Sequence, residues 1–541
     1  YREIQPEQIK IIDPCMGSGH ILVYAFDVLM DIYTACGWSE RDAAKSILRN
    51  NLYGLDIDRR AYQLAYFAVM MKARQYNRRI LSAENQPNLA NFADVMHVDT
   101  SLLSGSLRKF AEQFQFADTY GSLMTVTKPA GLDEAVSAFL PTFGMQAEQL
   151  EMMMRVARIL TQKYDVVCTN PPYMGGSGMN ATLSDFIKKN YPDYKSDLFS
   201  AFVVKCTKMA KLEGYLGFLT PYVWMFIQSY EKMRNYIYST RTIETLIQFE
   251  YSAFEEATVP ICTFVLKNSK VRKNGAYLRL TEFRGGMEVQ RQKALEAISN
   301  HKCGFYYESN AENFSKIPGS PVAYWVSENF VRAFDGKKVG NYLNCRSGIM
   351  TGSDEFIKQW YEVNYNNIKF NCKTAKDMLD YKWFPLNSGG EFRKWYGNNS
   401  KIVNLQNDGA KIKATVKNFR LREKTFYFKR GITWGRITSS KIAFRDVIQG
   451  SLFGDAGPIG FIEENRNYLL GFLCSNVSLF CLQATNPTLN YQVRDIESEP
   501  LILSVGHLPL VNKKVQENID LSKADWDSFE TSWDFEGHPL V

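Results

Sequence analysis

The sequence predicts an α/β protein with a doubly wound sheet in its first part, followed by a second domain of mixed α+β type. Two observations carry this prediction. Up to about residue 285, short apolar strands alternate with longer helical segments, which is typical of a parallel sheet covered by helices. After that point, strand-like pieces are separated by glycine, asparagine and serine, as at Asn387–Gly390. We therefore expect domains at 1–285 and 286–541, the second ending in a helical segment.

The elements of the first domain follow from the spacing of apolar residues. Strands are predicted at Ile9–Ile12, Leu52–Asp58, Val95–Val98, Val166–Thr169, Tyr215–Leu219, Ile243–Phe249 and Val259–Leu266. Helical spacing is found in Ile21–Cys36, Ser39–Arg49, Ala61–Gln75 and the long connection Leu102–Lys163. Near the end of the chain, Ala524–Glu536 carries Trp526, Phe529 and Trp533 at helical spacing, and we expect this face to pack on the body of the protein.

The composition excludes several classes of protein. Hydrophobic residues make up 45% of the 541 and charged residues 22%, which excludes a disordered chain. The richest apolar runs, Gly214–Ile227 and Leu469–Leu482, are too short and too interrupted to span a membrane. The ten cysteines are scattered singly without a Cys-x-x-Cys pair, so we expect no metal site and reduced thiols in a cytoplasmic protein.

A glycine-rich turn follows the first predicted strand. Its sequence is Asp13-Pro14-Cys15-Met16-Gly17-Ser18-Gly19, and two glycines let the backbone approach a ligand closely. The dinucleotide fingerprint and the Walker A loop are both absent, so a nucleoside without phosphates fits better than a nucleotide. Asp56 ends the second strand, where an acid can accept hydrogen bonds from ribose hydroxyls. Asp99 follows the predicted third strand.

The tetrapeptide Asn170-Pro171-Pro172-Tyr173 follows the fourth predicted strand and is the most specific motif of the chain. The prolines stiffen the turn, so that the Asn170 side chain and the Pro171 carbonyl are presented as neutral acceptors. An exocyclic amine is a weak nucleophile, and two acceptors on its hydrogens orient its lone pair toward an electrophile. A base inside a duplex must be flipped out for this chemistry, and Tyr173 supplies a ring for stacking.

These motifs resemble the S-adenosylmethionine-dependent DNA methyltransferases that act on the N6 amine of adenine, with motif order of the γ class. The resemblance covers 1–270. It implies a Rossmann-like methyltransferase fold and a catalytic role for Asn170, Pro171, Pro172 and Tyr173. It implies cofactor binding by Asp13, Pro14, Met16, Gly17, Gly19, Asp56, Ile57, Asp99 and Phe199, and base holding by Phe254–Val265. The family motif that normally precedes Asp13 is missing and the chain starts at Tyr1, so we expect part of a longer protein.

The second domain carries a basic stretch. Between Lys401 and Asp446 there are 12 Lys or Arg and three Asp or Glu, interleaved with aromatic residues, against a net charge of +7 for the whole chain. Such a stretch suits a nucleic-acid backbone. The side chains that we expect to contact DNA are Arg420, Arg422, Arg430, Arg436 and Lys441.

Further motifs of this domain resemble the adenine methyltransferase component of BREX phage-defence systems. They are Trp383–Gly390, Arg393–Asn398 and Asn486–Val493, whereas Arg346–Gly352 resembles the Gly-x-x-Thr-Gly entry to the recognition region of fused type II methyltransferases. The resemblance implies a target-recognition domain and methylation of one adenine in a short site of double-stranded DNA, which marks host DNA as self. Other defence proteins, and a phage-encoded inhibitor that mimics DNA, are the partners that it implies.

Three alternatives stay open at the level of sequence. The chain can be the methyltransferase and recognition part of a type IIG restriction–modification enzyme whose nuclease lies upstream of Tyr1. It can methylate another amine or amide, such as a glutamine side chain or RNA, although the large basic domain argues against small protein-methylating enzymes. It can also be a DNA-binding sensor that depends on partners and does not turn over alone.

Overall fold

A computed structural model describes residues 4–82, 84–95, 99–103, 105–139, 144–251, 253, 259–378, 381–438, 441–447, 449–462, 464–486 and 488–538. The chain forms two compact units, Tyr1–Ser315 and Lys316–Val541. The units divide 30 residues after the domain boundary that we expect at residue 285.

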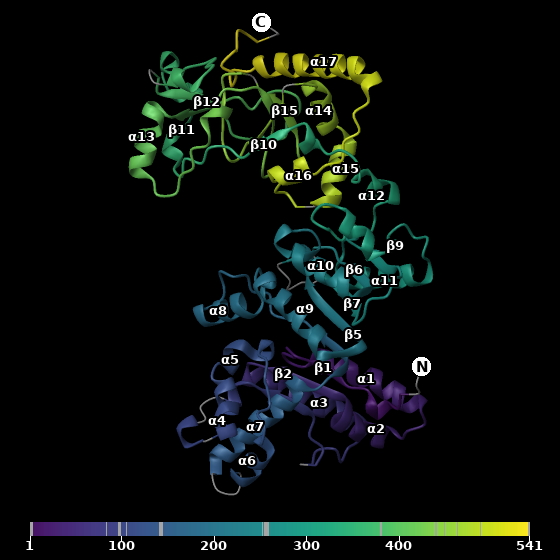
Figure 1. The fold of residues 1–541 in the computed structure, drawn as a ribbon. Coiled ribbons are helices and arrows are strands. Elements are labelled where there is room, and N and C mark those ends of the chain that lie inside the picture. Colours follow the sequence, from purple (N-terminus) through teal and green to yellow (C-terminus); the bar gives the residue numbers. More distant parts are fainter. Residues whose placement is uncertain are drawn as a thin grey trace. The chain divides into compact units, whose positions relative to one another are not determined.

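The first unit is built on a nine-stranded sheet with the strand order β3-β2-β1-β4-β5-β7-β6-β8-β9 (Figure 1). The strands are β1 (Ile11–Asp13), β2 (Leu52–Asp56), β3 (Asn88–Asn91), β4 (Tyr164–Thr169), β5 (Ala210–Pro221), β6 (Thr242–Gln248), β7 (Ile261–Lys267), β8 (Gly275–Arg279) and β9 (Tyr306–Ser309). Strands β3 to β5 are parallel, and β7 runs antiparallel between β5 and β6. The doubly wound α/β fold is therefore confirmed.

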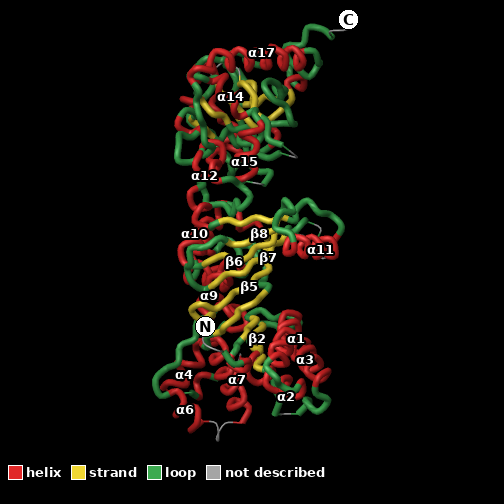
Figure 2. The backbone as a smooth tube through the Cα atoms, turned by 90° about the vertical axis from the view of Figure 1, so that its right-hand side faces the viewer, coloured by secondary structure: helices red, strands yellow, loops and turns green. Residues whose placement is uncertain are grey.

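Helices cover both faces of this sheet (Figure 2). The larger helices are α1 (His20–Ala35), α2 (Glu40–Ser46), α3 (Arg59–Tyr76), α7 (Gly144–Thr161), α8 (Ala181–Asn190), α9 (Leu198–Met209), α10 (Glu231–Thr240) and α11 (Gly286–Ser299). Helices α1, α2 and α3 lie on one side, where their apolar residues form one core cluster with β2, and α7, α9 and α10 lie on the other. The strand order reverses between β1 and β4, because the connections before and after this point cross opposite faces.

The long connection between β3 and β4 is helical, as its sequence predicts. It contains α4 (Gly105–Ala111), α5 (Ala117–Tyr120), α6 (Leu132–Phe139) and α7, with short turns between them. The predicted position of the third strand, by contrast, is wrong. The strand is Asn88–Asn91, whereas Val95 ends a 3-10 turn and residues 96–98 of the predicted strand lie outside the described residues. The observed strand has only two apolar residues, Leu89 and Ala90, and is defined by its pairing with β2.

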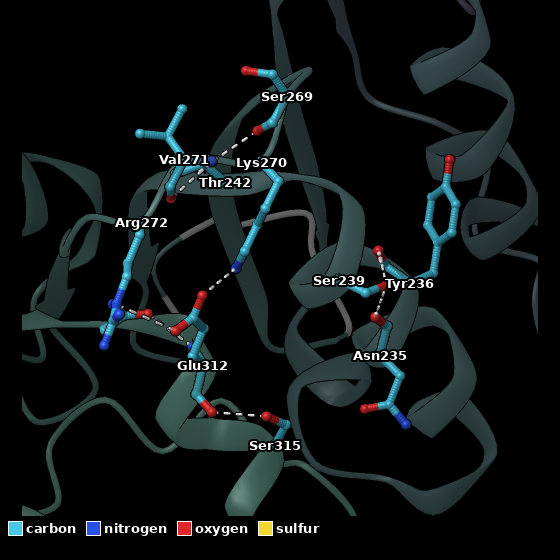
Figure 3. A network of polar contacts seen from close by, with 11 residues as sticks. Asn235, Tyr236, Ser239, Thr242, Ser269, Lys270, Val271, Arg272, Glu312 and Ser315 are labelled. Carbon is cyan, nitrogen blue, oxygen red and sulfur yellow. Dashed lines mark hydrogen bonds and ion pairs between the residues drawn. The ribbon is translucent and has the colours of Figure 1, made fainter.

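The sheet continues beyond the expected domain boundary. Strand β8 pairs parallel to β6, and β9 pairs antiparallel to β8 after helix α11. The end of the unit is attached by Glu312, whose carboxylate lies 3.4 Å from Lys270 Nζ and 3.7 Å from Arg272 Nε (Figure 3). Both cations come from the connection between β7 and β8, so these ion pairs bring the last turn of the unit back to its sheet.

The second unit has two four-stranded sheets and separate helices, which confirms the mixed α+β type. One sheet has the order β10-β17-β14-β15 and the other β11-β13-β12-β16. The strands are β10 (Asn344–Arg346), β11 (Ile357–Gln359), β12 (Trp383–Asn387), β13 (Lys401–Asn404), β14 (Gly431–Trp434), β15 (Phe444–Val447), β16 (Leu452–Phe453) and β17 (Ile459–Phe461). The helices are α12 (Glu328–Ala333), α13 (Gln406–Thr415), α14 (Arg466–Leu473), α15 (Asn476–Thr485), α16 (Val493–Glu497) and α17 (Leu508–Asp527).

The C-terminal helix lies earlier than predicted. Helix α17 ends at Asp527, so the expected helix over Ala524–Glu536 is wrong beyond that residue. Ser532 turns the chain back by donating to the Asp527 carboxylate at 2.7 Å. Trp533 packs on Phe370 with ring centroids 5.4 Å apart, whereas Phe529 is exposed. Only part of the predicted aromatic face is therefore packed.

Neither a membrane-spanning helix nor a metal-binding cluster is found among the described residues. No single helix is long and apolar enough to cross a membrane; the bent pair α14 and α15 passes the same test only by length and composition. Within the same residues, no group of three or more His, Cys, Asp or Glu side chains is arranged to hold a metal ion.

Candidate active site

The glycine-rich turn leads from β1 directly into helix α1. Gly17 has a φ of +52°, and its amide donates to the Asp56 carboxylate at 2.9 Å. Gly19 has a φ of +86°, and a Cβ at this position would lie 2.9 Å from the Cα of Ala65 in α3. The turn therefore needs glycine for two reasons: a left-handed backbone at both positions and direct contact with the next helix at the second.

Asp13, at the end of β1, is buried beneath this turn. Its Oδ1 accepts from the amide of Cys15 at 3.0 Å and from the hydroxyl of Thr169 at 2.7 Å. Burial raises the pKa of Asp13 to about 7, although both hydrogen bonds favour the ionised form. The carboxyl group links the end of β1 to the end of β4, and it supports the turn from below.

Asp56 and Asp58 follow each other at the end of β2 but have different surroundings. Asp56 Oδ1 accepts from the amide of Asp58 at 2.8 Å, while its Oδ2 receives the Gly17 amide. The side chain of Asp58 caps helix α3 by accepting from the amide of Arg60 at 2.7 Å. The Asp56 side chain therefore contacts the glycine-rich turn, whereas the Asp58 side chain caps helix α3.

The tetrapeptide from Asn170 to Tyr173 leaves β4 at the same edge of the sheet. The Asn170 side chain is exposed, and Tyr173 Oη lies 2.7 Å from its Oδ1 in donor geometry. The same hydroxyl lies 3.2 Å from the carbonyl of Leu219. The Tyr173 ring meets the edge of Phe199 at 6.4 Å, and Phe199 stacks on Tyr230 at 5.4 Å. A row of rings thus supports the tyrosine from behind.

A cavity of about 240 Å³ lies between the glycine-rich turn and the tetrapeptide. Its lining residues are Pro14, Cys15, Asp56, Ile57, Phe92, Thr119, Tyr120, Gly121, Ser122, Leu123, Asn170, Pro172, Leu183, Leu198 and Phe202. They include the residues that follow β1, β2, β3 and β4, so the cavity opens at the carboxyl edge where the strand order reverses. This is the position at which open α/β sheets bind ligands.

The structure brings together only some of the predicted site residues. Pro14, Asp56, Ile57, Asn170 and Pro172 line the cavity, and Gly17 bonds to one of these residues. Gly19 contacts helix α3 instead, and four other predicted cofactor residues do not line the cavity either. Met16 is part of the core under the turn, Asp13 lies below it, Phe199 is fully buried behind Tyr173, and Asp99 is exposed and accepts from Ser101.

Phe92 and the segment Thr119–Leu123 belong to the site but are not predicted by the sequence. Phe92 directly follows β3, so the same strand-end rule that selects Asp56 would select it once the strand is placed correctly. The segment comes from the long helical connection. Gly121 has a φ of +50°, and a Cβ there would lie 2.8 Å from Ile57. Ser122 donates to the Pro14 carbonyl at 2.6 Å, which holds the segment over the turn.

The predicted DNA-contacting residues of the second unit have unequal surroundings. Arg420 and Lys441 are exposed. Arg430 pairs with the buried carboxylate of Asp446 at 3.3 Å. Arg422 and Arg436 both pair with Asp455. Most aromatic residues interleaved with this stretch are not stacking surfaces, because Tyr427, Phe428, Trp434 and Phe444 are buried in the core.

Comparisons with known proteins agree with the fold. The family model described as Eco57I restriction-modification methylase matches residues 50–254. Over 99% of its length, the chain is 35% identical to the adenine-specific methyltransferase PglX of Lacticaseibacillus casei and 33% identical to the adenine-specific methyltransferase BrxX of Escherichia coli. The chain spans 47% of each, about half of their length. The resemblance stated from the motifs is thereby confirmed.

Solved structures extend the likeness to both units. The Type IIL restriction-modification enzyme MmeI, solved in complex with DNA, aligns over 98% of this chain and 67% of its own, with a TM-score of 0.56 and 11% identity. A nuclease-deletion mutant of the Type ISP enzyme LlaGI aligns over 95% of this chain and 44% of its own, with a TM-score of 0.54 and 12% identity. At such identities the likeness concerns the fold alone.

Proposed function

We propose that the chain is the methyltransferase and target-recognition part of a site-specific DNA methyltransferase, which transfers a methyl group from S-adenosylmethionine to the N6 amine of adenine. One observation carries the proposal: Asp56 and Asn170 line one cavity at the carboxyl edge of the sheet. The Asp56 carboxylate suits the ribose hydroxyls of the cofactor, and the Asn170 amide oxygen suits the amine of the target base. Cofactor and target can therefore meet in this cavity. The similarity to PglX and BrxX, both adenine-specific methyltransferases, supports the same activity.

The cavity fits a nucleoside cofactor. The Asp56 carboxylate has acceptor positions left beside its two amide contacts, and these suit ribose hydroxyls. Ile57, Phe92 and Leu198 supply apolar walls for an adenine ring. The amino-acid end would lie along the glycine-rich turn, whose glycines let the ligand approach the backbone. When bound, S-adenosylmethionine supplies an electrophilic methyl group.

The residues of the tetrapeptide act on the target amine. Asn170 Oδ1 and the Pro171 carbonyl accept hydrogen bonds from the two amine hydrogens and so direct the nitrogen lone pair toward the methyl carbon. Tyr173 Oη occupies the Asn170 acceptor in the free protein and leaves it when the amine arrives. Its ring then stacks on the flipped base. With the cofactor bound, the nitrogen would form the new bond to the methyl carbon as the carbon–sulfur bond breaks, and it would afterwards release a proton to water.

The second unit would select the sequence that is methylated, and the biological role would be to mark host DNA as self in a BREX-like phage defence. Partners would be double-stranded DNA and other defence proteins, and an inhibitor that mimics DNA would compete for the same surface. A DNA substrate and ten free cysteines favour a cytoplasmic location.

Long-read sequencing tests the proposal. The natural protein and its Asn170→Ala variant are expressed in cells that lack other adenine methylation, together with the neighbouring genes of its own locus. We expect N6-methyladenine at one short motif with the natural protein and none with the variant. Asn180→Ala serves as the control, because the Asn180 side chain caps helix α8. Adenine methylation by this variant should persist.

Cofactor binding separates the remaining possibilities. The Asn170→Ala variant should bind S-adenosylmethionine nearly as well as the natural protein, since the asparagine is assigned to the amine. Absence of modified adenine with both proteins would contradict the proposal and favour a DNA-binding sensor. Loss of cofactor binding by the variant would mean that the role of Asn170 is misassigned.

A further inference from the structure

A single carboxylate of the second unit holds two arginines that come from different segments. Asp455 follows strand β16 and has one oxygen for each partner. Arg422 Nη2 lies 3.9 Å from its Oδ1, and Arg436 Nη1 bonds to its Oδ2. The two arginines are separated by strand β14, so only the fold brings them to one point.

The carboxylate is itself fixed by the backbone. The Asp455 amide donates to the Ile349 carbonyl at 2.9 Å, and the Ile349 amide donates to the Phe453 carbonyl at 2.7 Å. A Cβ at Gly348 would lie 2.2 Å from the same Phe453 carbonyl, so this close approach requires glycine. The glycine-containing motif Arg346–Gly352 therefore has a structural role, because it positions the turn that carries Asp455.

Each arginine also makes a hydrogen bond near the carboxylate, through the side chain in Arg422 and through the backbone in Arg436. Arg422 Nε donates to the Gly348 carbonyl at 2.9 Å, and the Arg436 amide donates to the Ala456 carbonyl at 3.0 Å. The side chains are partly buried, with 33% of Arg422, 29% of Arg436 and 23% of Asp455 exposed. Partial burial weakens solvent screening, so the side-chain contacts restrain the guanidinium groups more than surface ion pairs would: Arg422 has two such contacts, and Arg436 has the ion pair with Asp455.

The restrained guanidinium groups keep hydrogen-bond donors for a ligand. A guanidinium has five N–H donors. Arg422 gives its Nε–H to Gly348 and Arg436 gives one Nη1 hydrogen to Asp455, while the Nε of Arg436 is buried, so the donors left for a ligand are those of the terminal nitrogens. Recognition of guanine requires two donors of one guanidinium in the plane of the base, aligned with its O6 and N7. A carboxylate that sets the plane of the arginine therefore controls whether this alignment is reached.

We propose that Asp455 is a positioning residue for target recognition, which orients Arg422 and Arg436 as a pair of base-reading side chains. The inference rests on the proposed function, because it assigns part of the sequence selection of the same enzyme. It also separates these two arginines from the exposed Arg420 and Lys441, which are suited to phosphate contacts that carry no sequence information.

The test compares Asp455→Asn with Asp408→Asn in the natural protein. Asp408 is a matched control, since its carboxylate also bridges two cations, Lys413 and Lys424, each at 2.9 Å. Adenine methylation is mapped across the genome for both variants. We expect Asp455→Asn to relax the motif, with about tenfold more methylation at sites that differ from it at one or two positions. The Asp408→Asn variant should retain the motif of the natural protein.

Three outcomes would overturn the inference. An unchanged motif with Asp455→Asn would do so while leaving the proposed function intact. Loss of methylation by this variant together with a lower melting temperature would assign Asp455 a purely structural role. Absence of methylation with the natural protein would reject the proposed function itself, and the inference with it. Loss of methylation at an unchanged melting temperature would support it, because target recognition would have failed in a folded protein.

Discussion

Asp13 at the end of β1 and Asp56 at the end of β2 are residues of one type that have different roles because their surroundings differ. Asp13 is buried and accepts hydrogen bonds from Cys15 and Thr169. Asp56 lines the cavity and touches the glycine-rich turn. The pKa of Asp13 is raised because its carboxyl group is buried, whereas Asp56 is accessible to a ligand because it lines the cavity. Substitution of either residue should therefore affect a different property of the protein.

Asp56→Ala should weaken binding of S-adenosylmethionine by about tenfold to a hundredfold, because hydrogen bonds to a charged acceptor contribute about 1.5–3 kcal/mol. Isothermal titration calorimetry measures this change. Asp58→Ala is the control two residues later: it removes the cap of helix α3 and should lower stability while leaving cofactor affinity unchanged. Equal cofactor affinity of the natural protein and Asp56→Ala would refute the ribose assignment.

Asp13→Asn should stabilise the protein at alkaline pH. The pKa of Asp13 is raised in the folded state to about 7, so its favourable contribution is complete below its ordinary pKa of 3.8 and is lost as the pH rises through about 7. Asparagine keeps the Oδ1 acceptor without the buried charge. We expect a gain of at least about 1 kcal/mol at about pH 8 and little gain at about pH 4. Denaturant unfolding across this pH range measures the free energy of unfolding of both proteins. A difference in this free energy that is the same at every pH would contradict the prediction.

At the scale of elements, the site depends on how the turn between β1 and α1 packs against α3. The turn donates an amide to Asp56 through Gly17 and touches the backbone of α3 through Gly19. The segment Thr119–Leu123 covers it through the bond of Ser122 to Pro14. A change at the contact with α3 should therefore displace both the turn and the cavity.

Gly19→Ala should destabilise the protein more than Gly17→Ala. Both substitutions force alanine into a left-handed backbone conformation, which costs about 1–2 kcal/mol. Only the first also places a Cβ 2.9 Å from backbone of α3, whereas a Cβ at Gly17 meets nothing within 4 Å. We expect an additional loss of about 1–3 kcal/mol for Gly19→Ala, measured by urea unfolding. Equal losses would show that α3 moves freely away from the turn.

At the scale of the whole molecule, the positive charge of residues 401–446 is not spread over one open surface. Arg445 is buried and donates to the carbonyls of Gly389 and Arg393. Arg430 is held by Asp446, and Asp455 holds two more arginines. Exposed cations such as Arg420 and Lys441 are therefore the better candidates for contacts with DNA phosphates.

DNA affinity should fall steeply with salt, because each phosphate contact releases a counterion. Replacing both Arg420 and Lys441 by alanine should lower the slope of log K against log salt concentration by about two, with the methylated motif unchanged. Fluorescence anisotropy at several salt concentrations measures the slope. Lys302→Ala, an exposed lysine of the first unit, is the control and should leave it unchanged. An unaltered slope in the double variant would exclude these two residues from the DNA contact.

The parts of the fold that the sequence predicts well are those with local signals. Asp13–Gly19 marks the end of β1, and Asn170–Tyr173 marks the end of β4, because glycine and proline restrict the backbone wherever they occur. Strand β3 lacks such a signal: its two apolar residues do not stand out, and its pairing with β2 defines it. For this reason the predicted strand falls on Val95–Val98, and Phe92 is not recognised as a wall of the cavity.

By itself, the sequence determined the α/β class, the two-part organisation and the two motifs that meet at the cavity, because these depend on residue types and on spacing along the chain. Only the tertiary structure decided that Thr119–Leu123 covers the glycine-rich turn, that Phe199 lies behind Tyr173, and that Arg422 and Arg436 meet at Asp455. Such contacts join residues far apart in the chain. They are set by the packing of whole elements, which no local pattern of residues encodes.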